Sequence, residues 1–291
     1  MHDSALPQLP RTLRLGPTHL TVSDLAGSLA FYENALGLKL RERDGDAGTA
    51  SLGAGGEDLL VLVEERGASP AGRHAGLYHY ALLFGSRVEL ARAVRRLATS
   101  GSRIEGASDH GVSEAIYLRD GDDNGIELYV DRPRDAWPAP VRPDERVGMY
   151  TNRLDLKGLM ATVDDEDFHP QAGAGLRTGH LHLHVGDIEE GLAFYRDVLG
   201  FDVMVNLGSA AFVSAGGYHH HLGFNVWMGS DVGAPPPRTA GLRHWTVVLD
   251  AAQEVSDVRE RVSAAGYEVV DKDGGFLVRD PWGTGVAFLA D

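Results

Sequence analysis

Residues 18–25 read Thr-His-Leu-Thr-Val-Ser-Asp-Leu, and residues 29–32 read Leu-Ala-Phe-Tyr, five positions before Gly37. The stretch begins with alternating apolar and polar residues, which is typical of a half-buried strand, and continues with apolar residues at helical spacing. Ser23 or Asp24 can cap this helix, and Gly37 stands where helices commonly end in a left-handed residue. After this strand and helix, three short strands are expected at residues 39–43, 49–52 and 58–64.

The same pattern recurs later in the chain. Residues 182–188 and 192–195 repeat it 163 positions on, and a different unit at residues 76–83 recurs 165 positions on at residues 241–248. Two repeats at nearly equal offsets predict a duplicated half, and each half contains two units. The predicted fold class is α+β, with four βαβββ modules that pair into two barrel-like half-domains.

The units suggest a domain organisation. Residues 15–131 are expected to hold the N-terminal pair of modules and the metal, and residues 179–291 the C-terminal pair. Residues 132–178 are rich in proline and predict a linker with a short helix near residues 154–163. A single unit cannot bury both its sheet and its helix, so units adjacent in sequence are expected to pair.

Composition excludes several classes of protein. The chain of 291 residues contains no cysteine, so disulfides, thiolate metal sites and a cysteine nucleophile are excluded. Its formal net charge of −15 argues against binding to nucleic acid. No apolar run is long enough for a membrane span, and the first 14 residues lack the apolar core of a signal peptide, so we expect a cytoplasmic protein.

Three residues on predicted strands are candidate metal ligands. His19 and His79 lie on the first strands of two units, and Glu127 lies in the middle of the apolar strand at residues 126–130. A carboxylate buried in a sheet is costly unless it is paired or binds a metal. Two histidines and one carboxylate leave coordination positions open, as in the facial arrangement of non-haem Fe(II) sites.

These strands resemble those of a known family. Residues 18–20, 77–80 and 120–129 are similar to the metal-ligand strands of the vicinal oxygen chelate superfamily, which includes glyoxalase I, bleomycin-resistance proteins and extradiol dioxygenases. Residues 109–118 and 214–221 resemble its catechol 2,3-dioxygenase-like branch. The resemblance implies an Fe(II) enzyme, with Mn(II) or Zn(II) as alternatives, that uses His19, His79 and Glu127 as ligands. It implies a homo-oligomer in aromatic catabolism whose partners are a catechol-like diol and O₂.

The second half lacks part of this pattern. Residues 280–288 align with residues 120–128 without a gap, and Ala287 stands where the first half has Glu127. His182 and His244 occupy the two histidine positions. The second half is therefore expected to be a degenerate copy, unless one of the residues His219–His221 completes a second site, and sequence alone leaves that question open.

Two further residues are candidate acid–base groups. Tyr117 precedes Glu127 by ten positions, a spacing that resembles the tyrosine near the metal in extradiol enzymes, and His110 lies in the loop before the strand of Tyr117. Either could move protons during catalysis. A tyrosine that only packs in the barrel and a solvated loop histidine are the structural alternatives.

Two other functions remain open on sequence grounds. A metal-dependent isomerase or lyase of the glyoxalase type would use the same chelation without O₂, although the strand at residues 58–63 has no carboxylate in its middle, where glyoxalase I often has one. A protein that only binds a small molecule, as resistance proteins do, is the other alternative. Such proteins usually lack the ligand triad.

Overall fold

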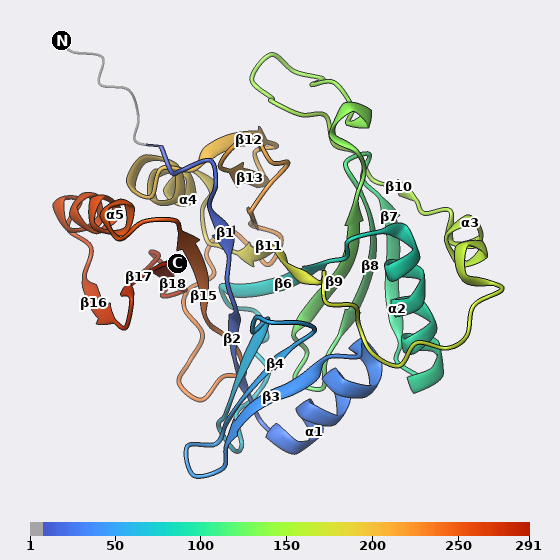
Figure 1. The fold of residues 1–291 in the computed structure, drawn as a ribbon. Helices are drawn as coiled ribbons and strands as arrows, with labels where there is room; N and C mark the ends of the chain where they lie inside the picture. Colours follow the sequence, from blue (N-terminus) through green and yellow to red (C-terminus); the bar gives the residue numbers. More distant parts are fainter. Residues whose placement is uncertain (1–7) are drawn as a thin grey trace.

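The computed structural model describes residues 8–291 and contains two nine-stranded sheets in a mixed α+β fold (Figure 1). The predicted βαβββ order is found in all four units. Unit 1 contains β2 (Thr18–Val22), α1 (Leu25–Phe31) with the π-helical turn η1 (Tyr32–Leu36), β3 (Lys39–Asp44), β4 (Thr49–Gly53) and β5 (Leu60–Glu64). Unit 2 contains β6 (Gly76–Leu83), α2 (Arg87–Ser100), β7 (Ile104–Asp109), β8 (Ser113–Arg119) and β9 (Gly125–Asp131).

The second half repeats this order. Unit 3 contains β11 (Arg177–His184), α4 (Ile188–Leu192) with the π-helical turn η4 (Ala193–Val198), β12 (Asp202–Asn206), β13 (Ala210–Ser214) and β14 (Leu222–Asn225). Unit 4 contains β15 (Gly241–Leu249), α5 (Ala252–Ala264), β16 (Val269–Lys272), β17 (Gly275–Arg279) and β18 (Gly285–Ala290). The short strand β1 (Arg14–Leu15) pairs with β15.

The segment between the halves carries the predicted short helix. It contains η2 (Arg134–Ala136), β10 (Asn152–Arg153), α3 (Leu156–Met160) and η3 (Ala161–Val163), and Figure 1 shows α3 beside α2. β10 extends a sheet by pairing with β7. The ion pair between Arg92 Nε and Glu166 Oε2, at 2.7 Å, fastens the acidic end of this segment to α2. The segment thus packs on unit 2 through β10, α3 and Glu166.

The units do not pair within each half, as the two predicted half-domains required. One sheet joins unit 1 to unit 4 through the antiparallel pair β2 and β15, and the other joins unit 2 to unit 3 through β6 and β11. The two units of each half meet instead through side chains: Tyr32 donates to Asp120 at 2.7 Å in the first half, and Tyr195 donates to Asp280 at 2.9 Å in the second. Neither sheet closes into a barrel.

Local signals in the sequence produce the helix that leads each half. The side chain of Asp24 accepts hydrogen bonds from the backbone N–H groups of Ala26 and Gly27, so Asp24 is the N-cap of α1. Gly37 ends η1 with φ of 74°, a conformation that other residues adopt only at a cost. Asp187 caps α4 in the same way as Asp24 caps α1.

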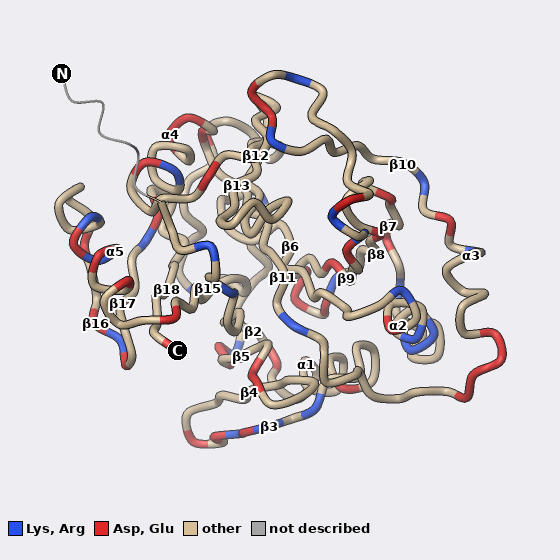
Figure 2. Tube along the Cα trace, turned by 45° about the horizontal axis from the view of Figure 1, so that its top comes forward, with Lys and Arg blue, Asp and Glu red and all other residues tan. Residues whose placement is uncertain are grey.

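Charge is distributed over both halves of the molecule. Figure 2 shows Lys and Arg interspersed with Asp and Glu along the trace, including the outer helices α2 and α5. Within residues 8–291, no helix has the length and apolar character needed to cross a membrane.

Candidate active site

The pairing of β6 with β11 brings histidine side chains of units 2 and 3 close together. His79 on β6 lies opposite His182 on β11, and His180 lies on the same face as His182 because side chains alternate along a strand. β9 runs parallel to β6 on its other side and places Glu127 opposite Ala81. The face of this seam therefore collects histidines from two units and one carboxylate.

Three of these side chains, those of His79, Glu127 and His180, converge on one point and form what we call the metal group. Glu127 Oε2 lies 3.0 Å from His79 Nε2 and 3.1 Å from His180 Nε2, and all three residues are buried. In residues 8–291 this is the one group of three His, Asp or Glu residues whose donor atoms lie within 4.8 Å of one another. His79 Nε2 is buried and makes no well-directed hydrogen bond. Two imidazole nitrogens and one carboxylate oxygen aimed at a single point fit a divalent transition metal.

The electrostatics of the group match the donor states that a metal requires. Burial raises the pKa of Glu127, but the rings of His180 and His79 oppose this effect more strongly and hold the pKa well below its usual value. Burial lowers the pKa of His180, although Glu127 partly offsets that effect. An ionised carboxylate beside a neutral imidazole is the form that binds metal ions.

The structure brings His79 and Glu127 together, but it places His19 in the other sheet. His19 on β2 lies opposite His244 on β15, and their rings stack with centroids 3.9 Å apart. The correction to the expected ligand set follows from the pairing order, because β6 has β11 beside it and not a strand of unit 1. His180 stands where His19 was expected, and strand alternation with His182 and His184 was the sequence signal for it.

The second-half histidines do not form the second site that sequence left open. His182 lies at the seam of units 2 and 3, whereas His244 lies in the other sheet. In the repeat with an offset of 163 residues, His180 corresponds to Pro17. In the alignment of residues 120–128 with residues 280–288, which has an offset of 160 residues, Glu127 corresponds to Ala287. Among the described residues of the sheet of units 1 and 4, no group with metal-ligand geometry occurs.

His19 is expected to make the fold less stable in acid, and it is not expected to bind the metal. Burial, together with the charges of Lys272 and Arg243, lowers the pKa of His19 to about 4, below its value in the unfolded chain. As pH falls from 6.5 to 4, the unfolded chain takes up this proton first, so the free energy of unfolding decreases. His19→Asn should remove up to about 2 kcal/mol of this acid destabilisation. Urea unfolding of both proteins at pH 7 and pH 4.5 measures it, and an unchanged difference between the two pH values would contradict it.

The two candidate acid–base residues lie together beside the metal group. His110 Nε2 is 2.8 Å from the hydroxyl of Tyr117, and Tyr117 on β8 lies opposite Glu127 on β9. The rings of Tyr117 and His79 have centroids 5.7 Å apart. Burial, with the nearby charge of Glu127, raises the pKa of Tyr117 well above its usual value, so its hydroxyl keeps its proton.

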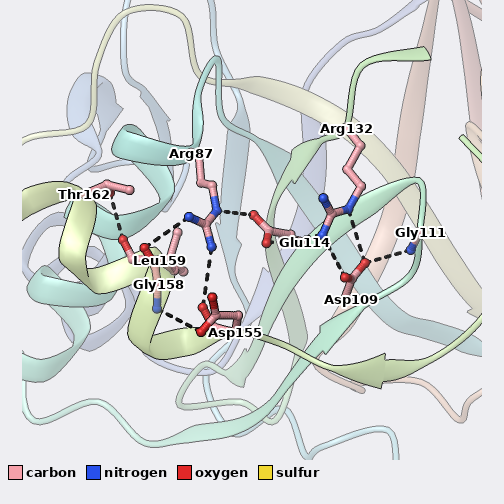
Figure 3. A network of polar contacts seen from close by, with 9 residues as sticks. All are labelled: Arg87, Asp109, Gly111, Glu114, Arg132, Asp155, Gly158, Leu159 and Thr162. Atoms are coloured by element: carbon pink, nitrogen blue, oxygen red, sulfur yellow. Dashed lines mark hydrogen bonds and ion pairs between the residues drawn. The ribbon is translucent and has the colours of Figure 1, made fainter. Parts of the chain in front are cut away.

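An ion-pair network holds the loop that carries His110 (Figure 3). Arg132 Nη2 lies 2.7 Å from Asp109 Oδ2, and the other side of the network pairs Arg87 Nε with Glu114 Oε2 at 2.6 Å. Asp109 also accepts a hydrogen bond from Gly111 N. Gly111 has φ of 78°, and a Cβ there would lie 2.7 Å from the Tyr150 ring, so the loop requires glycine.

Glu114 is buried between Arg87 and Arg132, and its loss should disturb this loop. We expect Glu114→Ala to cost about 2 kcal/mol of unfolding free energy, less than a fully buried pair because both arginines are partly exposed. Thermal unfolding and catalytic rate measured on the same sample test the expectation. Arg41→Ala, which removes an ion pair to Asp58 in the other sheet, is the control and should change stability by less than about 1 kcal/mol.

A chain of hydrogen bonds from Asp131 through His219 leads to His220, another histidine in the wall of the site. His219 Nε2 lies 2.8 Å from Asp131 Oδ1, and His219 Nδ1 lies 2.8 Å from His220 Nδ1. With the Asp131 carboxylate accepting from His219, the Nδ1–H of His220 donates to His219, and Nε2 of His220 is left as an acceptor. The ring of His220 lies 4.1 Å from that of His180, between centroids. Sequence reasoning named His220 only as a possible ligand of a second metal.

The metal group lies in the wall of a cavity of about 540 Å³. His110, Tyr117 and His220 also line this cavity. A volume of this size falls within the range of cavities that bind small organic molecules. The arrangement therefore combines a group that could hold a metal ion, side chains that could transfer protons and room for an organic molecule.

Comparisons with known proteins identify relatives of this chain. A model of the Glyoxalase/Bleomycin resistance protein/Dioxygenase superfamily matches residues 14–128 and 177–291. The chain is 42% identical over 276 residues to the catechol-2,3-dioxygenase of Bacillus subtilis (strain 168), which covers 92% of this chain and 93% of the relative.

Solved structures share the fold at low sequence identity. A putative dioxygenase from Bacillus subtilis subsp. subtilis str. 168 superimposes with a TM-score of 0.61 at 15% identity, covering 99% of this chain and 86% of that one. Glyoxalase I from Zea mays gives a TM-score of 0.57 at 15% identity, with 96% and 92% covered. Both similarities concern the fold alone.

Proposed function

Because the chain belongs to the Glyoxalase/Bleomycin resistance protein/Dioxygenase superfamily, we propose that it is an extradiol dioxygenase. In this reaction a catechol-like ring opens beside its two hydroxyls, and both atoms of O₂ enter the product. The observation that carries the proposal is the buried group of His79, Glu127 and His180 in the wall of the large cavity. The 42% identity to a catechol-2,3-dioxygenase supports the choice of reaction within the superfamily.

The three residues would hold one Fe(II), with Mn(II) or Zn(II) as the alternatives that the same donors accept. When bound, the metal supplies adjacent coordination positions for the two oxygens of the diol and for O₂, and a path for electrons from the ring to oxygen. Glu127 and His180 are suited to this role as found, since one is ionised and the other neutral. His182 Nε2 is hydrogen-bonded to the side-chain amide of Asn225, so this nitrogen is not free to bind the metal.

The surrounding residues would bind the substrate and move its protons. Nε2 of His220 would accept a proton from a diol hydroxyl. The hydrogen bonds from His220 through His219 to Asp131 would stabilise the positive charge that the His220 imidazole then carries. The Tyr117 hydroxyl would hydrogen-bond an oxygen of the reacting ring, and a proton would pass between that oxygen and His110 through this hydroxyl and its 2.8 Å contact with His110 Nε2. Burial of His79, Glu127 and His180 would limit access of water to the reacting end of the ring.

Metal content and oxygen uptake measured on the same preparation test the proposal. Fe(II)-loaded protein should consume one O₂ per catechol and form a yellow semialdehyde, and the activity should decline as the iron oxidises. Reductant with ferrous iron should restore it. If iron-loaded protein takes up no oxygen with any member of a catechol panel, the proposed function is incorrect. Turnover of a substrate that does not need O₂ would then indicate a metal-dependent isomerase or lyase.

A further inference from the structure

The cavity beyond the metal group is larger than one aromatic ring needs. Its volume of about 540 Å³ is in the range that holds drug-sized ligands, whereas a bare catechol is a single ring with two hydroxyls. The metal ligands are buried, so a chelated diol would occupy the deep end. The remaining space extends from that ring toward the surface and must be filled by another part of the substrate or by water.

The walls of this outer space are apolar. Val112, Val147, Met204 and Val205 form a buried cluster separate from the main core, and Met149 and Phe212 pack against it. Val205 and Phe212 come from β12 and β13, whereas Met149 comes from the segment between the halves. Met149, Val205 and Phe212 also line the cavity. Two parts of the chain that are distant in sequence thus combine into one apolar wall.

The mouth of the cavity is also apolar, although it is exposed to solvent. Tyr150, Leu207 and Trp227 line the cavity with 44%, 52% and 55% of their surfaces exposed. They belong to three different loops, so the patch arises from the tertiary structure. Exposed apolar residues that gather at a cavity indicate a binding surface more strongly than the same residues scattered singly.

The charged groups of the cavity leave no unpaired positive charge for an anionic ligand. Arg119 is the one Lys or Arg that lines it, and its Nε lies 3.1 Å from Glu105 and 3.4 Å from Asp123. Glu145 at the wall is likewise paired with Arg142, at 2.8 Å. A carboxylate on the substrate would lose its hydration here without gaining an unpaired counterion. An ammonium would find the carboxylates of Glu105 and Glu145 already paired with arginines.

On the basis of the proposed function, we infer that the substrate is a catechol with a neutral, apolar substituent. The diol binds at the buried metal group. The substituent lies along Met149, Val205 and Phe212 and reaches Leu207 and Trp227 at the mouth. These side chains therefore determine which catechol is preferred, and they do so without taking part in ring opening.

Binding of analogues that cannot be cleaved tests the inference apart from the reaction. 4-Ethylphenol, 4-hydroxyphenylacetate and tyramine share one ring and chain length but carry a neutral, an anionic and a cationic end. Calorimetric titration of the full-length protein with its own metal, under nitrogen, should give the lowest Kd for 4-ethylphenol, by at least about tenfold over either charged analogue. Equal affinities, or tightest binding of a charged analogue, would overturn the inference.

Variants at the mouth test which residues set the preference. Leu207→Arg introduces a cation at an exposed position, so it should improve 4-hydroxyphenylacetate binding about tenfold relative to 4-ethylphenol. Leu40→Arg, at a 41% exposed leucine on β3 of the other sheet, is the matched control and should leave this ratio unchanged. The same ratio shift in both variants would overturn the assignment of Leu207.

The two proposals can fail separately. If the protein prefers 4-ethylphenol but cleaves no catechol, the dioxygenase proposal is wrong and the inference about the apolar cavity is supported. If it cleaves 4-ethylcatechol, 3,4-dihydroxyphenylacetate and dopamine with equal kcat/KM, the dioxygenase proposal holds and the inference about the substituent is overturned.

Discussion

Glu127→Ala should lower the bound metal to less than about a tenth per chain and reduce ring cleavage by roughly 1,000-fold or more. The two imidazole nitrogens that remain, His79 Nε2 and His180 Nε2, would lose the negative oxygen that now lies 3.0 and 3.1 Å from them. His180→Ala should have the same effect, since it removes another of the three donors. Metal quantification after gel filtration, with activity measured on the same fractions, checks both variants.

The fold itself should tolerate the change at Glu127. Ala287, which corresponds to Glu127 in the duplicated half, is fully buried in the other sheet between strands of the same arrangement. Loss of metal can therefore be separated from loss of structure by circular dichroism. His19→Ala is the control and should retain the metal, because His19 stacks on His244 in the sheet of units 1 and 4. Retention of metal by Glu127→Ala together with its loss from His19→Ala would refute the ligand set.

Tyr117→Phe and His110→Ala should each lower kcat by about 100-fold while leaving metal content unchanged. Neither side chain belongs to the metal group, but Tyr117 lies opposite Glu127 and is hydrogen-bonded to His110 at 2.8 Å. Two groups that act as one proton path give effects that do not add. The double variant should therefore have nearly the same kcat as the slower single variant.

Tyr195→Phe provides the matched control for the loss of a buried hydroxyl. Tyr195 donates to Asp280 at 2.9 Å in the second half, away from the cavity, so its variant should lose about 1 kcal/mol of stability and keep a normal kcat. If Tyr117→Phe behaves in the same way, Tyr117 is structural. Fully additive losses in the double variant would show that the two residues do not share a path.

The strands and helices of the βαβββ modules could be predicted from the sequence, because the signals for them are local. Alternation, helical spacing, the cap at Asp24 and the glycine at position 37 each depend on a few neighbouring residues, and the structure confirms them. The offset repeats predicted four βαβββ units, and all four are present. The family resemblance, drawn from the same motifs, is confirmed by the superfamily match and by the 42% identical relative.

The candidate site was accessible to sequence only in part. His79 and Glu127 lie on one unit, where β6 and β9 are neighbours in the parallel register of the βαβββ pattern. Their proximity follows from the fold of that unit alone. The contact between His110 and Tyr117 also lies within unit 2, across the turn from β7 to β8.

The third member of the metal group, His180, could not be predicted from the sequence because it depends on how the units pair. All four units have a similar first strand, so local preferences cannot specify which two first strands pair. The pairing joins residues that are distant in sequence: β6 pairs with β11, whereas the two units of each half meet through the hydrogen bonds of Tyr32 to Asp120 and of Tyr195 to Asp280. Because β11 lies beside β6, His180 faces Glu127 and His19 faces His244.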